Sequence, residues 1–98
     1  MAEIVWTEEA ERWLRDIYDY LAAENPAAAT KVITGIHERG QVLRHFPEIG
    51  HIYRAEPEGY IRILLYGHYR IAYLLRASRR IDVLGVFHGA LDIERYLR

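Results

Sequence analysis

Arginine side chains are the groups in this sequence best suited to chemistry, and five of them lie between residues 62 and 80. A guanidinium group holds a phosphate or a carboxylate through paired N–H donors and stabilises a developing negative charge. Arg62 and Arg70 fall on neighbouring predicted strands joined by a short turn, so we expect them to lie close together on one face. Binding of acids on a partner, a solvated sheet face and internal ion pairs are the alternatives for the whole set, which is Arg62, Arg70, Arg76, Arg79 and Arg80.

His88 ends an apolar, strand-like run, and an imidazole is suited to general acid–base chemistry near neutral pH. A histidine at the end of a strand also caps turns through a side-chain hydrogen bond, so His88 alone defines no site. Other catalytic patterns are missing from the sequence. It has no cysteine, its single serine, Ser78, stands in a predicted turn, and it has no glycine-rich phosphate loop.

The histidines do not have the spacing of metal ligands. His37 and His45 are eight residues apart on a predicted helix, whereas a zinc pair on a helix has a spacing of four. The acids between Glu8 and Asp19 are expected to form a solvated helix face rather than an acid–base pair. We therefore expect neither a metal site nor a cofactor.

Length and charge limit the function classes. The 98 residues predict a single domain over 1–98, and a hydrophobic share of 51% predicts a packed core. The net charge is -1, with an acidic first half and a basic second half, so direct specific nucleic-acid binding is not expected. With no cysteine, no signal-peptide pattern and no long apolar segment, we expect a cytoplasmic protein that does not associate with a membrane.

A strand and two helices are predicted in the first half. Residues 3–6 alternate, and Thr7 then stands as a helix N-cap before an acidic first turn. Asn25 and Pro26 are typical of the start of a second helix. Apolar residues at steps of three and four predict that the two helices form a hairpin with one buried side. These residues are Ala10, Trp13, Leu14, Ile17 and Leu21 in the first helix, and Ala29, Val32, Ile33, Ile36, Leu43 and Phe46 in the second.

The second half has the period of strands. Segments 60–66, 69–76 and 81–87 are separated by the turns 67–68 and 77–80, and residues 51–55 add a short strand. The prediction is an α+β fold: an N-terminal strand, a helical hairpin, a three- to four-stranded, mostly antiparallel sheet and a short C-terminal helix. One side of this sheet has no helix to cover it. We expect a partner to cover apolar residues of that side, namely Leu64, Leu74, Leu84 and Val86.

The motifs, in their order along nearly the whole chain, resemble the ParE branch of the RelE/ParE toxins. They are DIYDYLAAENPAAATKVITGI, FPEIG, HYRIAY and VLGVFHGALDIERYL. The resemblance implies the RelE/ParE-like fold and a toxin of a type II toxin–antitoxin module, held inactive by a ParD-like antitoxin. It also implies a target, DNA gyrase. The toxin would act by binding, and we expect the antitoxin or target to contact Arg62, Arg70, Arg76, His88 and Asp92.

The resemblance leaves two other functions open. RelE-type relatives cut messenger RNA on the ribosome, and in this chain the corresponding residues would be Arg62, Arg70, His88 and Tyr96. Ile61 and Ile63 stand where those nucleases carry two lysines, which argues against catalysis. The ParE pattern often has arginines where this chain has Gly85 and Leu91, so a degenerate member that only binds its antitoxin is the third possibility.

Overall fold

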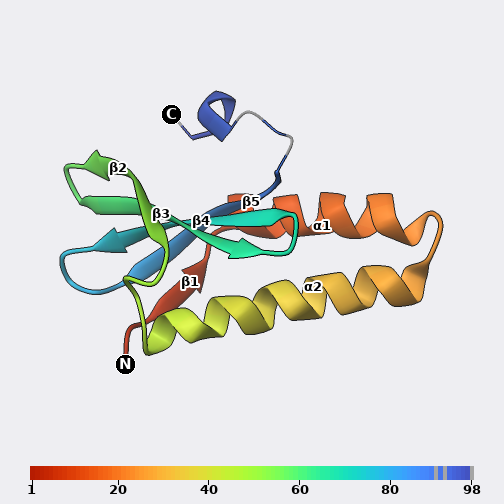
Figure 1. Cartoon of the computed structure of the whole chain (residues 1–98), viewed down its shortest axis with the longest axis horizontal. Helices are drawn as coiled ribbons and strands as arrows, with labels where there is room; N and C mark the ends of the chain where they lie inside the picture. Colours follow the sequence, from red (N-terminus) through yellow and green to blue (C-terminus); the bar gives the residue numbers. More distant parts are fainter. Residues whose placement is uncertain (90, 92, 98) are drawn as a thin grey trace.

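The computed structural model describes residues 1–89, 91 and 93–97. Its five strands form one sheet in the order β1-β5-β4-β3-β2 (Figure 1). β1 runs parallel to β5, and the other neighbours are antiparallel. The predicted α+β arrangement is confirmed, including the short strand before the three-stranded meander. The strands are β1 (Ile4–Trp6), β2 (His51–Glu56), β3 (Gly59–Tyr66), β4 (Tyr69–Arg76) and β5 (Ile81–His88).

Two capped helices, α1 (Glu8–Ala22) and α2 (Pro26–Gln41), form the predicted hairpin. The Thr7 hydroxyl accepts the backbone N–H of Ala10 at 3.1 Å, and the Asn25 side chain accepts that of Ala28 at 3.1 Å. Each cap satisfies an N–H group that the first turn of a helix leaves without an intrahelical partner. A 3₁₀ turn, Val42–Arg44, follows α2, and Phe46 beyond it is 62% exposed. The prediction that Phe46 continues the buried stripe is therefore wrong.

Both helices pack on one side of the sheet, which we call the helix face. Its buried residues come from β3, β4 and β5 and include Leu64, Ile71, Tyr73 and Val86. Leu14 of α1 and Ile36 of α2 fill the space above them. Leu64 and Val86 were expected on the uncovered side, and that expectation is wrong, because these two side chains are 2% and 0% exposed under the helices.

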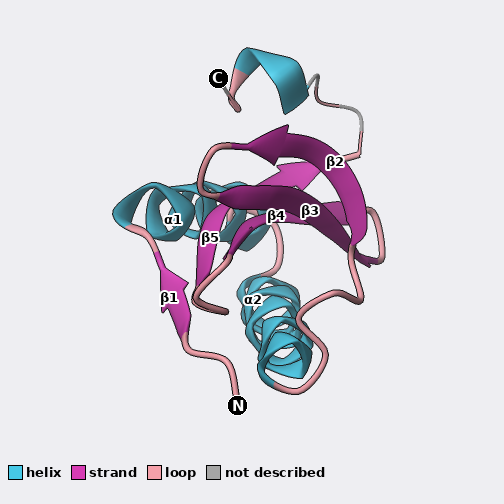
Figure 2. Cartoon of the chain, turned by 90° about the vertical axis from the view of Figure 1, so that its left-hand side faces the viewer, coloured by secondary structure: helices cyan, strands magenta, loops and turns pink. Residues whose placement is uncertain are grey.

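The other side of the sheet, which we call the C-terminal face, is covered in part by the end of the chain. Figure 2 shows this end and α2 on opposite sides of the sheet. We call residue 91 and residues 93–97 the C-terminal segment. This segment includes the 3₁₀ turn Ile93–Arg95. Ile93 and Leu97 are buried against a second apolar cluster, which contains Ile61, Ile63, Ala72, Leu74 and Phe87. The expectation that a partner covers Leu74 is therefore wrong, since this residue is only 6% exposed within the chain itself.

No helix in the described part of the chain has the length and apolar character needed to cross a membrane.

Candidate functional site

Arg62 and Arg70 lie on opposite faces of the sheet, which corrects the prediction that they share one face. The two-residue turn pairs Tyr66 with Tyr69, and from there the register pairs Arg62 with Tyr73 and Leu65 with Arg70. Directly paired residues share a face and successive residues alternate. Arg62 therefore lies on the helix face with Tyr73, and Arg70 lies on the C-terminal face.

On the helix face, Arg62 holds the loop between α2 and β2. Its Nη1 donates to the carbonyl oxygens of Glu48 at 3.0 Å and Gly50 at 2.7 Å. The Tyr73 hydroxyl donates to Pro47 O at 2.8 Å and accepts the Gly50 N–H at 3.0 Å. A Cβ on Gly50 would lie 2.7 Å from that hydroxyl and 2.8 Å from Ile63 O, so only glycine fits. Arg62 thus has a structural role in fixing the loop.

The surroundings of Tyr73 also change its acidity. Burial raises the pKa of the Tyr73 hydroxyl above its usual 10.0, because the phenolate loses hydration. The Gly50 N–H bond and the Arg62 charge oppose this by favouring the phenolate, and Glu48 adds to the rise. The net effect is a raised pKa, so the hydroxyl keeps its proton and remains the donor to Pro47 near neutral pH.

On the C-terminal face, Arg70 holds the C-terminal segment. Its Nη2 donates to Leu91 O at 2.6 Å and lies 3.5 Å from Gly89 O. Arg54 of β2 holds the far end of the same segment through Nη1 and Leu97 O, at 2.9 Å. Both arginines therefore bind backbone carbonyl groups of the segment, and neither contact requires an anionic ligand.

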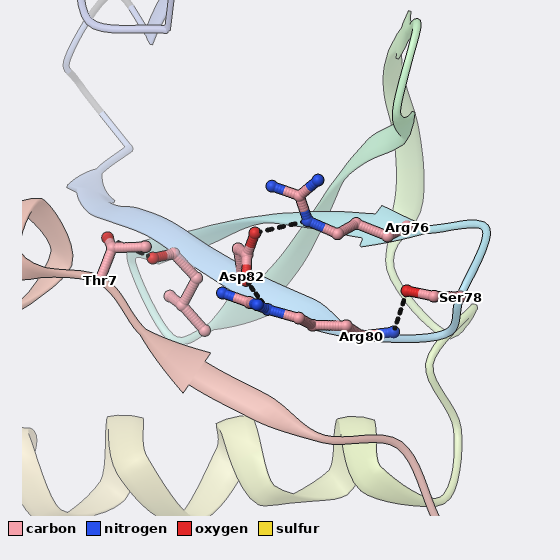
Figure 3. A network of polar contacts seen from close by, with 6 residues as sticks. Thr7, Arg76, Ser78, Arg80 and Asp82 are labelled. Atoms are coloured by element: carbon pink, nitrogen blue, oxygen red, sulfur yellow. Dashed lines mark hydrogen bonds and ion pairs between the residues drawn. The ribbon is translucent and has the colours of Figure 1, made fainter.

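Arg76 belongs to an internal ion-pair network at the outer end of β4 and β5. Its Nε donates to Asp82 at 2.8 Å, and Arg80 Nε donates to the second carboxylate oxygen of Asp82 at 2.9 Å (Figure 3). The Asp82 side chain is 7% exposed, so the carboxylate is nearly buried between two guanidinium groups. An internal ion pair was one of the alternatives for the arginine set, and it applies to Arg76 and Arg80.

Arg70 and His88 line the same depression at the end of the β3–β4 hairpin, although His88 pairs with Tyr69 and Arg70 pairs with Phe87. The His88 ring lies edge-on to Tyr69, with centroids 5.7 Å apart, and stacks on His68 at 6.3 Å. These side chains line a shallow depression of about 400 Å³. His68 was not predicted as a site residue. It lies in the turn next to Tyr69, the strand partner of His88, and no sequence signal marks this pairing because the register of β4 and β5 shifts at Ala72 and Tyr73.

Tyr96 belongs to an aromatic cluster on the C-terminal face. Its ring lies 5.0 Å from Trp13 and 5.8 Å from Phe87, and Trp13 and Phe87 are 4.7 Å apart. A Cβ on Gly85 would lie 2.6 Å from the Phe87 ring and 3.3 Å from Trp13. The aromatic cluster thus occupies the space above Gly85.

The proposed contact residue Asp92 lies outside the described residues. Among the residues that the structure describes, no three histidine, aspartate or glutamate side chains are grouped in a way that holds a metal ion. Of the predicted site residues, only Arg70 and His88 among the described ones line the same depression, and Arg62, Arg76 and Tyr96 lie at separate places.

A helical hairpin packed on one face of a five-stranded, mostly antiparallel sheet defines a small α+β protein. The family described as "ParE toxin of type II toxin-antitoxin system, parDE" matches residues 4–93. The chain belongs to this family, and is thus a toxin of the type II toxin–antitoxin class.

Two solved structures have a similar fold. A chain of the chromosomal ParDE TA system from P. aeruginosa is 24% identical, with a TM-score of 0.72, and the match covers 90% of this chain and 96% of that one. A chain of the toxin-antitoxin complex RelBE2 from Mycobacterium tuberculosis is 20% identical, with a TM-score of 0.55, and the match covers 89% and 96%. The comparison with curated proteins found no match.

Proposed function

We propose that this toxin is neutralised by a ParD-like antitoxin and, when free, inhibits DNA gyrase in the cytoplasm by binding rather than by turning over a substrate. The observation that carries this proposal is the separation of the residues that a RelE-type nuclease would use. Arg62 lies on the helix face, and its charge holds Glu48 O and Gly50 O. Tyr96 lies on the other side of the sheet, against Trp13 and Phe87.

The residues that stand in place of the two lysines of RelE-type nucleases support the same proposal. Ile61 and Ile63 are 4% and 3% exposed, and both contribute to the apolar cluster beneath the C-terminal segment. An isoleucine side chain transfers no proton and stabilises no phosphate charge. A buried apolar pair at this point therefore favours a protein that binds its target.

An antitoxin has a suitable docking surface at the free end of the helical hairpin. Both helices extend beyond the turn between β3 and β4 (Figure 1). Tyr20 is 82% exposed there, and a depression of about 350 Å³ is lined by Tyr20, Leu21, Ala23, Glu24, Asn25 and Ala28. An amphipathic helix of an antitoxin binds such a groove through apolar residues on one side. Both of the similar solved structures described above come from toxin–antitoxin systems, which supports a partner of this kind.

Expression of the chain alone and together with its neighbouring gene tests the toxin–antitoxin part. We expect growth arrest with the chain alone and rescue by the neighbour. Purified toxin is then expected to block supercoiling by DNA gyrase, and the block should be relieved by the purified antitoxin. Growth arrest and rescue without any effect on gyrase would refute DNA gyrase as the target but would support the toxin–antitoxin part of the proposal.

A ribosome-dependent ribonuclease is the second candidate, because Arg70 and His88 line one depression. If this candidate is correct, messenger RNA is cleaved on purified ribosomes, and Arg70→Ala abolishes the cleavage. Arg15→Ala, an exposed arginine on α1, is the matched control and should cleave normally. If expression of the chain is harmless but the chain binds its antitoxin tightly, the chain is instead a degenerate family member that only binds its antitoxin.

A further inference from the structure

The loop between α2 and β2 is rigid, yet it presents apolar side chains to solvent. Tyr73 and Arg62 together make four hydrogen bonds to the backbone of residues 47–50. On the same loop, Phe46 is 62% exposed and Ile49 is 48% exposed. A rigid, exposed apolar epitope loses little conformational entropy on binding, which is a property of protein–protein contact sites.

Two adjoining depressions extend this epitope across the end of the sheet. One, of about 390 Å³, is lined by Phe46, Pro47, Glu48, Ile49 and Arg79. The other, of about 230 Å³, shares Glu48 and Arg79 with the first and adds Tyr60, which is 47% exposed. Aromatic and arginine side chains of this kind are enriched at the centres of protein interfaces. We call the set Phe46, Glu48, Ile49, Tyr60 and Arg79 the loop surface.

The loop surface carries one acid and one base that do not neutralise each other. Glu48 and Arg79 line the same depressions, but no ion pair joins them, and neither has another ion-pair partner within the described ranges. Arg79 also has a φ of 71°, a left-handed conformation that is uncommon for a residue with a side chain. The turn bond from Arg79 N–H to Arg76 O, at 2.8 Å, fixes this conformation. The backbone of Arg79 is thus defined, and two exposed, opposite charges lie beside an apolar centre.

We propose that the loop surface is a two-fold interface between two copies of this chain. Arg79 of one copy would lie beside Glu48 of the partner subunit, and the reverse pair would form at the same time, while the apolar side chains meet between them. A two-fold interface requires a surface complementary to itself, and an unpaired acid and base around an apolar centre meet this requirement. The net charge of -1 gives little repulsion between copies.

The location makes such a dimer compatible with antitoxin binding, although the proposal does not depend on it. Figure 1 shows the end of α2 and the β4–β5 turn at one end of the molecule and the tip of the helical hairpin at the other. The loop surface consists of five residues, whereas a stable interface has roughly 20–30 residues on each side. We therefore expect a dissociation constant of about micromolar size.

Sedimentation equilibrium of the purified full chain, over a range from about 1 to 200 µM around that value, tests the proposal. We expect a monomer–dimer equilibrium in which Arg79→Glu and Glu48→Arg each raise the dissociation constant about tenfold or more. The double variant Glu48→Arg/Arg79→Glu exchanges the charges across the interface, so dimerisation should return to near the wild-type level. Circular dichroism of each variant establishes that it is folded.

A second pair of variants tests the apolar centre. Phe46→Ser should weaken dimerisation, whereas Tyr20→Ser, which removes an aromatic ring exposed at the opposite end, should leave it unchanged. A wild-type chain that stays monomeric over the whole range overturns the proposal, as does a folded double variant that dimerises no better than the single ones. If the monomeric wild type is toxic and Phe46→Ser removes toxicity but not antitoxin binding, the surface serves the cellular target instead.

Discussion

At the scale of single residues, the arginines of the sheet mainly bind backbone carbonyl groups of this chain. Arg62, Arg70 and Arg54 each direct Nη atoms to carbonyl oxygens of a loop or of the C-terminal segment. A guanidinium supplies five N–H donors, so a single arginine can satisfy several carbonyl groups where no regular strand or helix does so. The side-chain type that suggests a phosphate site in the sequence thus serves here to hold irregular backbone in place.

The Tyr73 hydroxyl gives a residue-scale prediction. Tyr73→Phe removes the donor to Pro47 O and the acceptor of the Gly50 N–H, and leaves both backbone groups without that partner. Because the side chain is 0% exposed, water cannot replace the hydroxyl without rearrangement. We expect the free energy of unfolding, measured by urea denaturation, to fall by about 1–3 kcal/mol. A change below about 0.5 kcal/mol would show that these bonds contribute little.

The raised pKa of Tyr73 predicts a pH dependence. In the unfolded chain the hydroxyl loses its proton near its usual pKa of 10.0, whereas in the folded chain burial raises the pKa. The stabilisation is therefore fully present below pH 10.0, and it is lost as the pH rises through the folded-state pKa. Urea denaturation at increasing pH should show this decline in the wild type.

The matched variant isolates the contribution of Tyr73 to the decline. Tyr73→Phe should have a shallower loss of stability above pH 10.0. A remaining slope is expected, because burial and the neighbouring Tyr20 also raise the pKa of Tyr69. Identical slopes in the variant and the wild type would contradict the assignment of the decline to Tyr73.

At the scale of elements, helix starts could be predicted from local sequence, whereas the face of a strand residue requires the register between strands. Thr7, Asn25 and Pro26 act within one helical turn, so their effect is local and visible in the sequence. The face of a strand residue depends on pairing with another strand. For β3 and β4 the turn at 67–68 already fixes the register, and counting back from Tyr66 and Tyr69 would have separated Arg62 from Arg70.

Irregular pairing limits the prediction further. The register between β4 and β5 shifts at Ala72 and Tyr73, and Leu84 has no partner in the ladder. This irregularity puts Val83 and Val86 on the same face, although they are three residues apart. A bulge reverses the alternation beyond it, and nothing in the local composition marks its position. The burial of Val86 under the helices could therefore not be predicted from alternation alone.

The helical hairpin gives an element-scale prediction. Leu14 is 4% exposed between α1 and the sheet, so Leu14→Ala should lower the free energy of unfolding by about 2–5 kcal/mol through the cavity that it leaves. Ile33 is only half-buried, and Ile33→Ala should cost less than about 2 kcal/mol. Arg15→Ala on the exposed side of α1 is the control, expected within about 0.5 kcal/mol of the wild type. Equal losses at Leu14 and Arg15 would contradict the assigned helix face.

Gly85 gives a second prediction at this scale. Gly85→Ala puts a Cβ within 2.6 Å of Phe87, so the ring must move and the contacts among Trp13, Phe87 and Tyr96 loosen. We expect a loss of about 1–3 kcal/mol in stability and a red shift of Trp13 fluorescence, measured with Trp6→Phe as the background. Val83→Ala in the same background tests whether a change elsewhere on β5 shifts the fluorescence. A shift of the same size there would mean that Trp13 does not report on Gly85.

At the scale of the whole molecule, this small chain buries apolar residues on both faces of its sheet. Among the described residues, the helix face is covered by two long helices and the C-terminal face by the short C-terminal segment and the Trp13 side chain. A short chain has little interior, so each buried residue contributes a large share of its marginal stability. The unequal cover of the two faces means that they are expected to open with different free energies.

The double variant Ile93→Ala/Leu97→Ala tests this difference between the two faces. Both side chains are nearly buried, at 4% and 6% exposed, and they attach the segment to the C-terminal face together with Arg54 and Arg70. If the segment opens locally, its backbone amides should exchange hydrogen more than about tenfold faster in the variant, while the amides of β4 exchange as in the wild type. Native-state hydrogen exchange measures both sets in one experiment, and Arg95→Ala, which lies on the segment but is exposed, controls for changes in intrinsic exchange. Equal acceleration of the β4 amides would mean that the segment unfolds only with the whole molecule, and that the two faces form one cooperative unit.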